Sequence, residues 1–266
     1  MANEVTILIL SHNRSWSLQQ CVGSIREWTR WPYHIVIQDH NSDAQHWEAI
    51  KQLQSDDCTV LRANSFLSCN EGRRVGLDHV QGDYVVFLDD DIKVERMWLT
   101  RMMTEMRRGD VGAVCGQVIQ NFGNTRMSWA RMLVNGSAKR MDYGFTGECD
   151  FCGGGATLYR LDALLETEFR SEFNGTGEDW DQILQMARNG WRIIGTDVHF
   201  FHFHQGDYDE YGTKRWRYTE IMDSALALYD RWGIRNVAVE CMAEMVSKEI
   251  PLQAHQAEKI KQIMEV

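Results

Sequence analysis

Short apolar runs alternate with helical patterns in the first 110 residues, and this alternation constrains the fold most. Val5–Leu10, Tyr33–Gln38, Cys58–Leu61 and Tyr84–Leu88 have the length and composition of buried strands. They follow one another at a spacing of roughly 25–30 residues, with helical patterns between them. Such spacing is typical of βαβ units, so we expect an α/β fold with a mostly parallel, Rossmann-like central sheet flanked by helices.

Polar side chains follow three of these strands directly. The segments are Ser11–Arg14, Asp39–Asp43 and the triplet Asp89-Asp90-Asp91. Ligands of open parallel sheets bind beyond the carboxyl ends of the strands. We therefore expect the three segments to meet in one crevice.

The second half of the chain has a weaker pattern. Residues 121–150 show no clear period, which predicts a long loop or irregular insert. We expect one domain over residues 1–266, with two functional halves (1–120 and 121–220) and a C-terminal helical extension (221–266). Within it, strand-like runs lie at 156–159, 191–196 and 198–203, and helical patterns at 182–188, 221–229 and after Pro251.

Charge and hydropathy narrow the classes of partner. Asp and Glu number 38 against 28 Lys and Arg, a net charge of −10, which disfavours nucleic acid without excluding it. No apolar run approaches the ~20 residues that span a bilayer, so no transmembrane segment is expected. No basic segment precedes the short apolar run at Val5–Leu10, and a cytoplasmic location is the expectation.

The acidic triplet Asp89-Asp90-Asp91 is the strongest single chemical feature. Three adjacent carboxylates repel one another unless a positive charge lies close by. A hard divalent cation such as Mg²⁺ or Mn²⁺, shared with substrate phosphates, is one explanation. A solvated acidic turn at the start of the next helix is the other, and the triplet alone leaves both open.

A second acidic group and two histidines follow later in the chain. Glu178, Asp179 and Asp181 lie at the start of a helix, where they serve either as N-caps or as a general base. His202 and His204 have strand spacing and share a face, so they are candidates for metal ligands or for packed core residues. Lys214 and Arg217 either clamp a diphosphate or form a solvated basic patch.

Several segments, in this order, closely resemble glycosyltransferase family 2, whose members are inverting nucleotide-sugar transferases of GT-A fold. They are Ser-His-Asn-Arg after the first strand, Asp39 after the second, "GDYVVFLDDDIKVERMWL", "CGGGATLYRLDALLE" and "GTGEDWDQILQMARNGWRIIGTDVHFFHFH". The resemblance covers about residues 4–206, and it implies that 1–120 is the nucleotide-sugar-binding half and 121–220 the acceptor and catalytic half. It implies transfer of a sugar from a nucleoside diphosphate sugar, commonly a UDP-sugar, to an acceptor hydroxyl with Mn²⁺ or Mg²⁺.

The resemblance also implies roles for individual residues. Asp89 and Asp91 fit the Asp-x-Asp pair, with Asp91 as the direct metal ligand, and His202 fits the strand-terminal histidine, with His204 as the fallback. Asp179 matches the catalytic base, beside Glu178. Residues expected to contact the donor are Ser11, Asn13, Arg14, Asp39 (the base-reading acid), Asn70, Arg74, Asp89 and Asp90, with Lys214 or Arg217 at the leaving group. Gly153–Gly155 resembles the turn that lets a sugar approach the backbone.

Two other functions remain open. A sugar-phosphate nucleotidyltransferase shares a similar sheet but requires a glycine-rich loop, and Ser11–Arg14 holds no glycine. A non-catalytic nucleotide-sugar-binding relative is disfavoured because the acids are retained. The acceptor is open among glycans, lipid-linked saccharides, polypeptides and modified DNA, and the C-terminal helices are a candidate surface for homo-oligomers.

Overall fold

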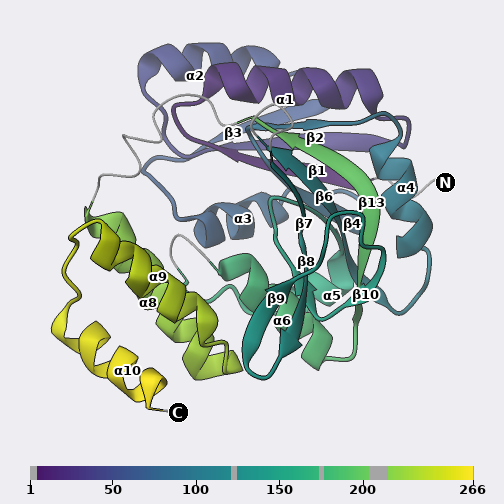
Figure 1. The fold of residues 1–266 in the computed structure, drawn as a ribbon. Coiled ribbons are helices and arrows are strands. Elements are labelled where there is room, and N and C mark those ends of the chain that lie inside the picture. Colours follow the sequence, from purple (N-terminus) through teal and green to yellow (C-terminus); the bar gives the residue numbers. More distant parts are fainter. Residues whose placement is uncertain (1–4, 121–124, 174–176, 204–214, 266) are drawn as a thin grey trace.

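The computed structural model describes residues 5–120, 125–173, 177–203 and 215–265, and it contains one large sheet covered on both faces (Figure 1). The main path of this sheet runs β10-β13-β6-β12-β4-β1-β2-β3. Its strands are β1 (Val5–Ser11), β2 (Tyr33–Asp39), β3 (Cys58–Arg62), β4 (Tyr84–Asp89), β6 (Val111–Gln120), β10 (Gly147–Cys149), β12 (Ala156–Arg160) and β13 (Arg192–His202).

The N-terminal half has the βαβ arrangement that the alternation predicts. Strand β1 pairs in parallel with β2 and β4, and β2 pairs in parallel with β3. This register sets Ser11 opposite Asp39 and Leu10 opposite Asp89, so the polar segments leave the sheet at one edge. The expected α/β class with a mostly parallel central sheet is confirmed.

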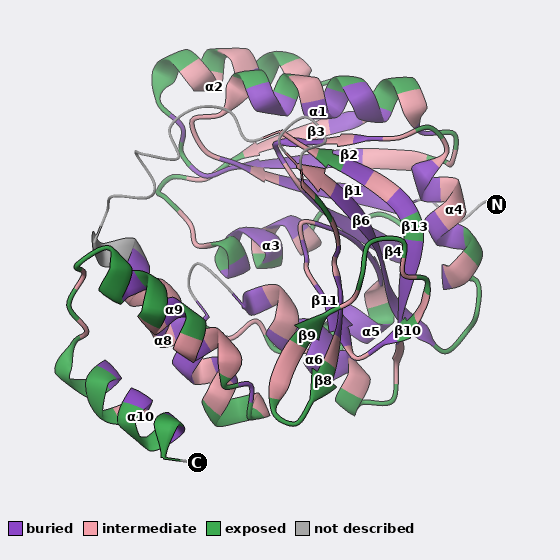
Figure 2. Ribbon diagram, viewed as in Figure 1, coloured by how far each residue is buried: buried purple, intermediate pink, exposed green. Residues whose placement is uncertain are grey.

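Helices form a layer on each face of the sheet (Figure 1). On one face, α1 (Ser15–Trp28), α2 (Ala44–Ile50) and α4 (Trp98–Met106) pack through Leu18, Ile25, Ile50, Trp98 and Met102. The other face is covered by α3 (Cys69–Leu77), α5 (Leu161–Leu165) and α6 (Glu178–Arg188). Figure 2 shows the strands between the layers as the most buried part of the molecule, as expected for continuous apolar runs.

Strand β12 joins the two halves of the sheet. It lies between β4 and β6 and is antiparallel to both. Beyond β6, β13 runs parallel to it as one strand, with register shifts at Arg192/Ile193 and between Gly195 and His199. Sequence reasoning expected two strand pieces here, because the exposed Asp197 breaks the apolar run where the register shifts.

The prediction of a loop or irregular insert at 121–150 is wrong. Of this segment the structure describes residues 125–150, which form β7 (Thr125–Ser128), β8 (Ala130–Val134), β9 (Ser137–Arg140) and β10. A small second sheet has the order β11-β8-β9, where β11 is Phe151–Cys152. These strands are short and only partly buried, so they leave no long hydrophobic alternation in the sequence.

The C-terminal helices pack around an apolar cluster of their own. The helices are α8 (Arg215–Trp232), α9 (Asn236–Ser247) and α10 (Ala254–Met264), and the cluster includes Met222, Leu226, Met245, Ile260 and Ile263. In the part of the chain that the structure describes, no helix combines the length and the apolar character that crossing a membrane requires. Association of two chains through these helices stays a prediction.

Candidate active site

The ends of β1 and β4 are held together by side-chain contacts. Ser11 Oγ donates a hydrogen bond to Asp90 Oδ2 at 2.7 Å. Arg14 Nη1 lies 3.2 Å from Asp90 Oδ1 and 3.0 Å from Asp91 Oδ2, so one guanidinium bridges two carboxylates. The segments after these two strands therefore meet, as the sheet topology predicts.

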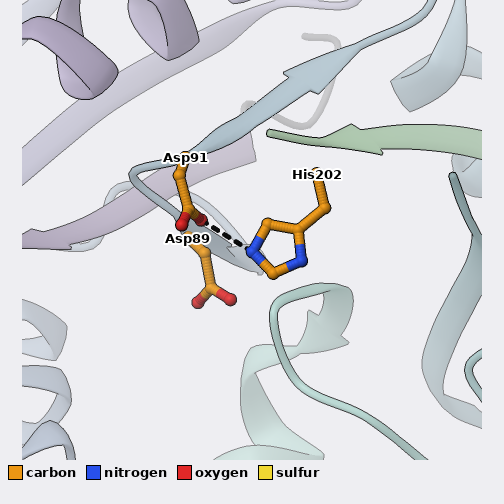
Figure 3. Close-up of side chains that lie close together, drawn as sticks. All are labelled: Asp89, Asp91 and His202. Atoms are coloured by element: carbon orange, nitrogen blue, oxygen red, sulfur yellow. Dashed lines mark ion pairs between the residues drawn. The ribbon is translucent and has the colours of Figure 1, made fainter. Parts of the chain in front are cut away.

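Asp89, Asp91 and His202 form a cluster at this edge (Figure 3). One ligand atom from each residue lies within 4.8 Å of those of the others, and His202 Nε2 is 2.9 Å from Asp91 Oδ1. The short strand β5 (Ile92–Val94) pairs with β13 and sets Ile92 opposite His202, which brings the histidine beside Asp91. Two carboxylates and one imidazole are a donor set that suits Mn²⁺ or Mg²⁺.

The electrostatics of this cluster favour a bound cation. Burial, followed by the charge of Asp91, raises the pKa of Asp89 to about 7. Burial also raises the pKa of Asp90 to about 6, although Arg14 opposes the shift. Burial of the His202 ring works against its charged form, yet the hydrogen bond with Asp91 and the Asp91 and Asp89 charges leave the pKa of His202 raised. A divalent cation would stabilise the ionised carboxylates.

Asp179 lies in the first turn of α6, against the turn Gly153–Gly155. Its Oδ2 accepts a hydrogen bond from the Gly154 N–H, and its Oδ1 accepts one from the Trp180 N–H at 3.0 Å. A Cβ on Gly154 would lie 2.5 Å from the Asp179 Cβ, and one on Gly155 would overlap Asp89 Oδ2. Asp179 and Asp89 thus lie against consecutive residues of a turn that contributes only backbone atoms.

Glu178 has a different position from Asp179. Its side chain is buried beneath α6, where Oε1 lies 3.5 Å from Arg73 Nη1 on α3. Burial raises the pKa of Glu178, against the opposing charge of Arg73. Sequence reasoning selected Arg74, which is exposed, and missed Arg73. The helical spacing of Asn70, Arg73 and Leu77 is the signal that places Arg73 on the packed face.

Three residues expected at the nucleotide mainly brace the loops around the crevice. Asp39 is fully buried and accepts hydrogen bonds from the Ser42 hydroxyl and the Ser42 N–H. Asn13, at a φ of 55°, accepts a hydrogen bond at 2.8 Å from the Asp43 N–H. Asn70 Nδ2 donates to the Arg170 carbonyl oxygen at 2.8 Å.

The positions of three predicted site residues relative to the cluster of Asp89, Asp91 and His202 are not described. His204 and Lys214 lie outside the described residues, and Arg217 falls in the first turn of α8, of which the backbone alone is described.

Trp129 is a further residue at the site, and sequence reasoning missed it. Its ring stacks on Phe200 at 5.9 Å between centroids, with 18° between the planes. Its Cη2 lies 3.3 Å from the point where a Gly155 Cβ would be, on the side that Asp89 also approaches. No signal marked Trp129, since its neighbours in sequence showed no readable period.

Comparison with known proteins assigns the chain to a family. Residues 6–167, more than half of the chain, match the sequence model of Glycosyl transferase family 2. The chain belongs to glycosyltransferase family 2. A solved structure, "Crystal structure of GalNAc-T7 with UDP, GalNAc and Mn2+", superposes with a TM-score of 0.65 at 15% identity, covering 94% of this chain and 58% of that one. This likeness confirms the GT-A fold of the family 2 chain.

Two curated relatives of this family 2 chain are longer proteins. The GalNAc(5)-diNAcBac-PP-undecaprenol beta-1,3-glucosyltransferase of Campylobacter jejuni is 23% identical over 65% of this chain and 56% of its own length. An N-acetylglucosaminyltransferase of Azorhizobium caulinodans is 26% identical over 71% of this chain and 51% of its own length. The matched part of the family 2 chain thus spans about half the length of these relatives.

Proposed function

We propose that this family 2 protein is a metal-dependent, inverting glycosyltransferase that moves a sugar from a UDP-sugar to an acceptor hydroxyl. One observation carries the proposal. Asp179 lies against Gly154, and Asp89 of the cluster with Asp91 and His202 lies against Gly155, so both groups border a turn that has no side chains. A donor sugar on this turn would have a base and a metal site beside it.

The metal would be held by Asp91, Asp89 and His202. Their oxygen and nitrogen atoms are close enough to share one Mn²⁺ or Mg²⁺. When bound, such an ion offsets the negative charge that develops on a departing nucleoside diphosphate. Ser11 and Arg14 fix Asp90 and Asp91, so these residues hold the acidic turn in a defined position.

Asp179 would act as the general base. Two backbone N–H groups bind its carboxylate, one oxygen each, and the second lone pair of each oxygen remains to take a proton. As that proton moves to Asp179, the oxygen of the acceptor hydroxyl forms a bond with the anomeric carbon of the donor sugar. The bond from this carbon to the diphosphate oxygen breaks with its electron pair, and the configuration inverts because attack comes from the opposite face.

The nucleotide would lie over the loops that follow β1 and β2. Ser11, Asn13 and Asp39 shape these loops, and Asn70 lies on the adjacent helix α3. UDP as the nucleotide rests on the resemblance and on the UDP of the similar GalNAc-T7 structure. Asp39 would read the base through a loop that it also braces.

The acceptor would be a saccharide hydroxyl, either free or lipid-linked. The names of the relatives include a transferase acting on a PP-undecaprenol saccharide and a succinoglycan biosynthesis protein of Rhizobium meliloti, 41% identical over 22% of this chain. Both concern carbohydrate assembly, and the excess of acidic side chains disfavours a nucleic-acid acceptor.

Calorimetric titration with UDP and a panel of UDP-sugars, with Mn²⁺ and then with EDTA, tests the proposal. We expect binding that requires the metal and slow donor hydrolysis in the absence of an acceptor. Asp91→Ala should abolish the metal-dependent part of binding. If EDTA and Asp91→Ala both leave UDP binding equal to that of the unmodified protein with Mn²⁺, the metal site is refuted. If the protein binds none of the nucleotide sugars, the function is refuted.

A further inference from the structure

Arg73 carries a buried charge that the proposed reaction does not yet use. It lies on α3 with only 6% of its surface exposed. Removing a guanidinium from water costs several kcal/mol unless partners replace the lost solvation. Burial is the largest single influence and disfavours the charge of Arg73, but Glu178 together with Cys69, Tyr159 and Asp179 leaves the pKa of Arg73 raised. The side chain is therefore a permanent cation inside the protein.

The partners of Arg73 come from the two elements that carry the acids of the site. Its guanidinium carbon lies 5.0 Å from the ring centroid of Phe87, a residue of β4 two positions before Asp89. Its Nη1 lies 3.5 Å from Oε1 of Glu178, the residue directly before Asp179 in α6. One side chain thus connects the strand of the metal cluster with the helix of the base.

The ion pair is poorly suited to stabilising the fold. Arg73 Nη1 and Glu178 Oε2 are both buried and have no hydrogen-bond partner among the described residues. Nearby polar atoms on the same elements, at Asn70 and Gln182, are unpartnered in the same sense. Apolar side chains often replace buried pairs of this kind without loss of stability. The presence of these two charges therefore calls for another reason.

We propose that Arg73 is a positioning residue, which holds the first turn of α6 against β4 and so sets the place of Asp179 relative to Asp89. The inference rests on the proposed function, in which these two carboxylates act on the same donor sugar. If the bridge is lost, the first turn of α6 loses its side-chain link to β4 and can shift against the glycine turn. A displacement of about 1 Å at a reacting group is enough to slow turnover about 100-fold.

The two hydrogen bonds of the Asp179 carboxylate give a readout that needs no activity. They are donated by the backbone N–H groups of Gly154 and Trp180, so exchange of these amides with deuterium reports the position of Asp179. The double variant Arg73→Met with Glu178→Leu removes both charges and keeps the volumes similar. We expect its Tm to equal or exceed that of the unmodified protein, while these two amides exchange about tenfold faster.

Kinetics provide the second readout for the same double variant. We expect kcat to fall about 100-fold with the donor KM little changed, because the metal cluster and the nucleotide loops stay intact. The matched control is Arg192→Met with Glu148→Leu, which removes a half-exposed Arg–Glu pair between β13 and β10, Nη2 to Oε2 2.9 Å. It should leave both readouts unchanged.

Two outcomes would overturn the inference. Unchanged exchange at Gly154 and Trp180 in the folded double variant would show that Arg73 does not position Asp179, whatever the activity. If the double variant does not fold, Arg73→Met with Glu178→Gln also removes both charges but keeps a polar group at position 178, and unchanged exchange at the same two amides would be equally decisive. If the unmodified protein shows neither transfer nor donor hydrolysis, the proposed function is refuted. The exchange experiment still decides the role of Arg73 in that case.

Discussion

Two carboxylates occupy the space into which side chains would extend at Gly154 and Gly155. Asp179 fills it at the first position and Asp89 at the second. Neither glycine is selected for a left-handed φ, since neither has one. The requirement is steric, and it comes from the acids of the site.

Gly155→Ala should therefore damage the metal cluster while the fold survives. The added Cβ would overlap Asp89 Oδ2, so the carboxylate must rotate away from Asp91 and His202. We expect Mn²⁺ affinity, measured by calorimetry, to fall at least about tenfold, the lower end of the effect of disturbing a ligand's support. Gly109→Ala is the control, because no atom lies within 4 Å of its Cβ position. Equal Mn²⁺ affinity in both variants would contradict the prediction.

Asp179→Asn should separate binding from turnover. Asparagine keeps the size of the side chain but cannot accept a proton at neutral pH, so kcat should fall at least about 100-fold. Affinity for UDP with Mn²⁺ should stay close to that of the unmodified protein, because the metal cluster borders Gly155 whereas Asp179 borders Gly154. Steady-state kinetics beside calorimetry provide the test. Unreduced turnover would exclude Asp179 as the base.

At the scale of secondary structure, α6 is anchored through Asp181 as well as through Glu178. The Asp181 carboxylate is buried and accepts hydrogen bonds from Arg170 Nη1 at 2.9 Å, Trp232 Nε1 at 2.8 Å and Gln185 Nε2 at 2.8 Å. Trp232 belongs to α8, so this one carboxylate joins the C-terminal helices to the helix of the proposed base.

Asp181→Ala should be among the more destabilising single substitutions in the protein. It removes one acceptor from three donors, of which Gln185 is buried and the charged Arg170 and Trp232 are partly buried, at a cost of roughly 2–4 kcal/mol of the free energy of unfolding. Urea denaturation measures this change. Asp162→Ala, at an exposed position in the first turn of α5, should change the same quantity by less than about 0.5 kcal/mol. A similar small effect at Asp181 would contradict its anchoring role.

The strands that could be predicted from the sequence differ from those that could not in the strength of their hydrophobic pattern. The strands ending at Ser11, Asp39 and Asp89 are mostly buried and mostly apolar, so their type, order and common edge follow from the sequence. Strand β10 pairs with the distant β13, whereas β7 pairs with the preceding β6 and β8 with the following β9. The signal is weak because these strands are short and partly exposed, so their own residues carry little pattern. In the same way, the triplet Asp89–Asp91 indicated an acidic site in the sequence. The packing of α3 is needed to show that Arg73 is buried and Arg74 exposed.

At the scale of the whole molecule, the hydrogen bonds that α10 makes to other helices go, among the described residues, to α8. It buries Ile260 and Ile263 in the cluster of C-terminal helices, and Gln256 Nε2 donates to the Thr219 carbonyl oxygen and to Asp223 on α8. None of these contacts reaches the sheet or the acidic cluster. Helix α10 and the site are therefore separable in principle.

Removal of residues 251–266 should lower stability without abolishing nucleotide binding. Loss of two buried isoleucines exposes apolar surface worth roughly 3–6 kcal/mol, so Tm should fall by several degrees. Affinity for UDP with Mn²⁺ should stay within about threefold of the intact chain, a change of less than one kcal/mol. Thermal denaturation and calorimetry on the same sample measure both. If the shortened protein keeps its remaining secondary structure but no longer binds UDP, residues 251–266 contribute to the site.

The position of β12 in the sheet has a consequence for biosynthesis. Strand β6, an uncharged ten-residue run, pairs with β7, β12 and β13, all of which follow it in the chain. A nascent chain ending near residue 150 thus presents one edge of β6 with no partner strand, a state prone to aggregation. Emergence of residues 156–202 from the ribosome closes that edge, and the same event first brings Asp179 to the end of β4.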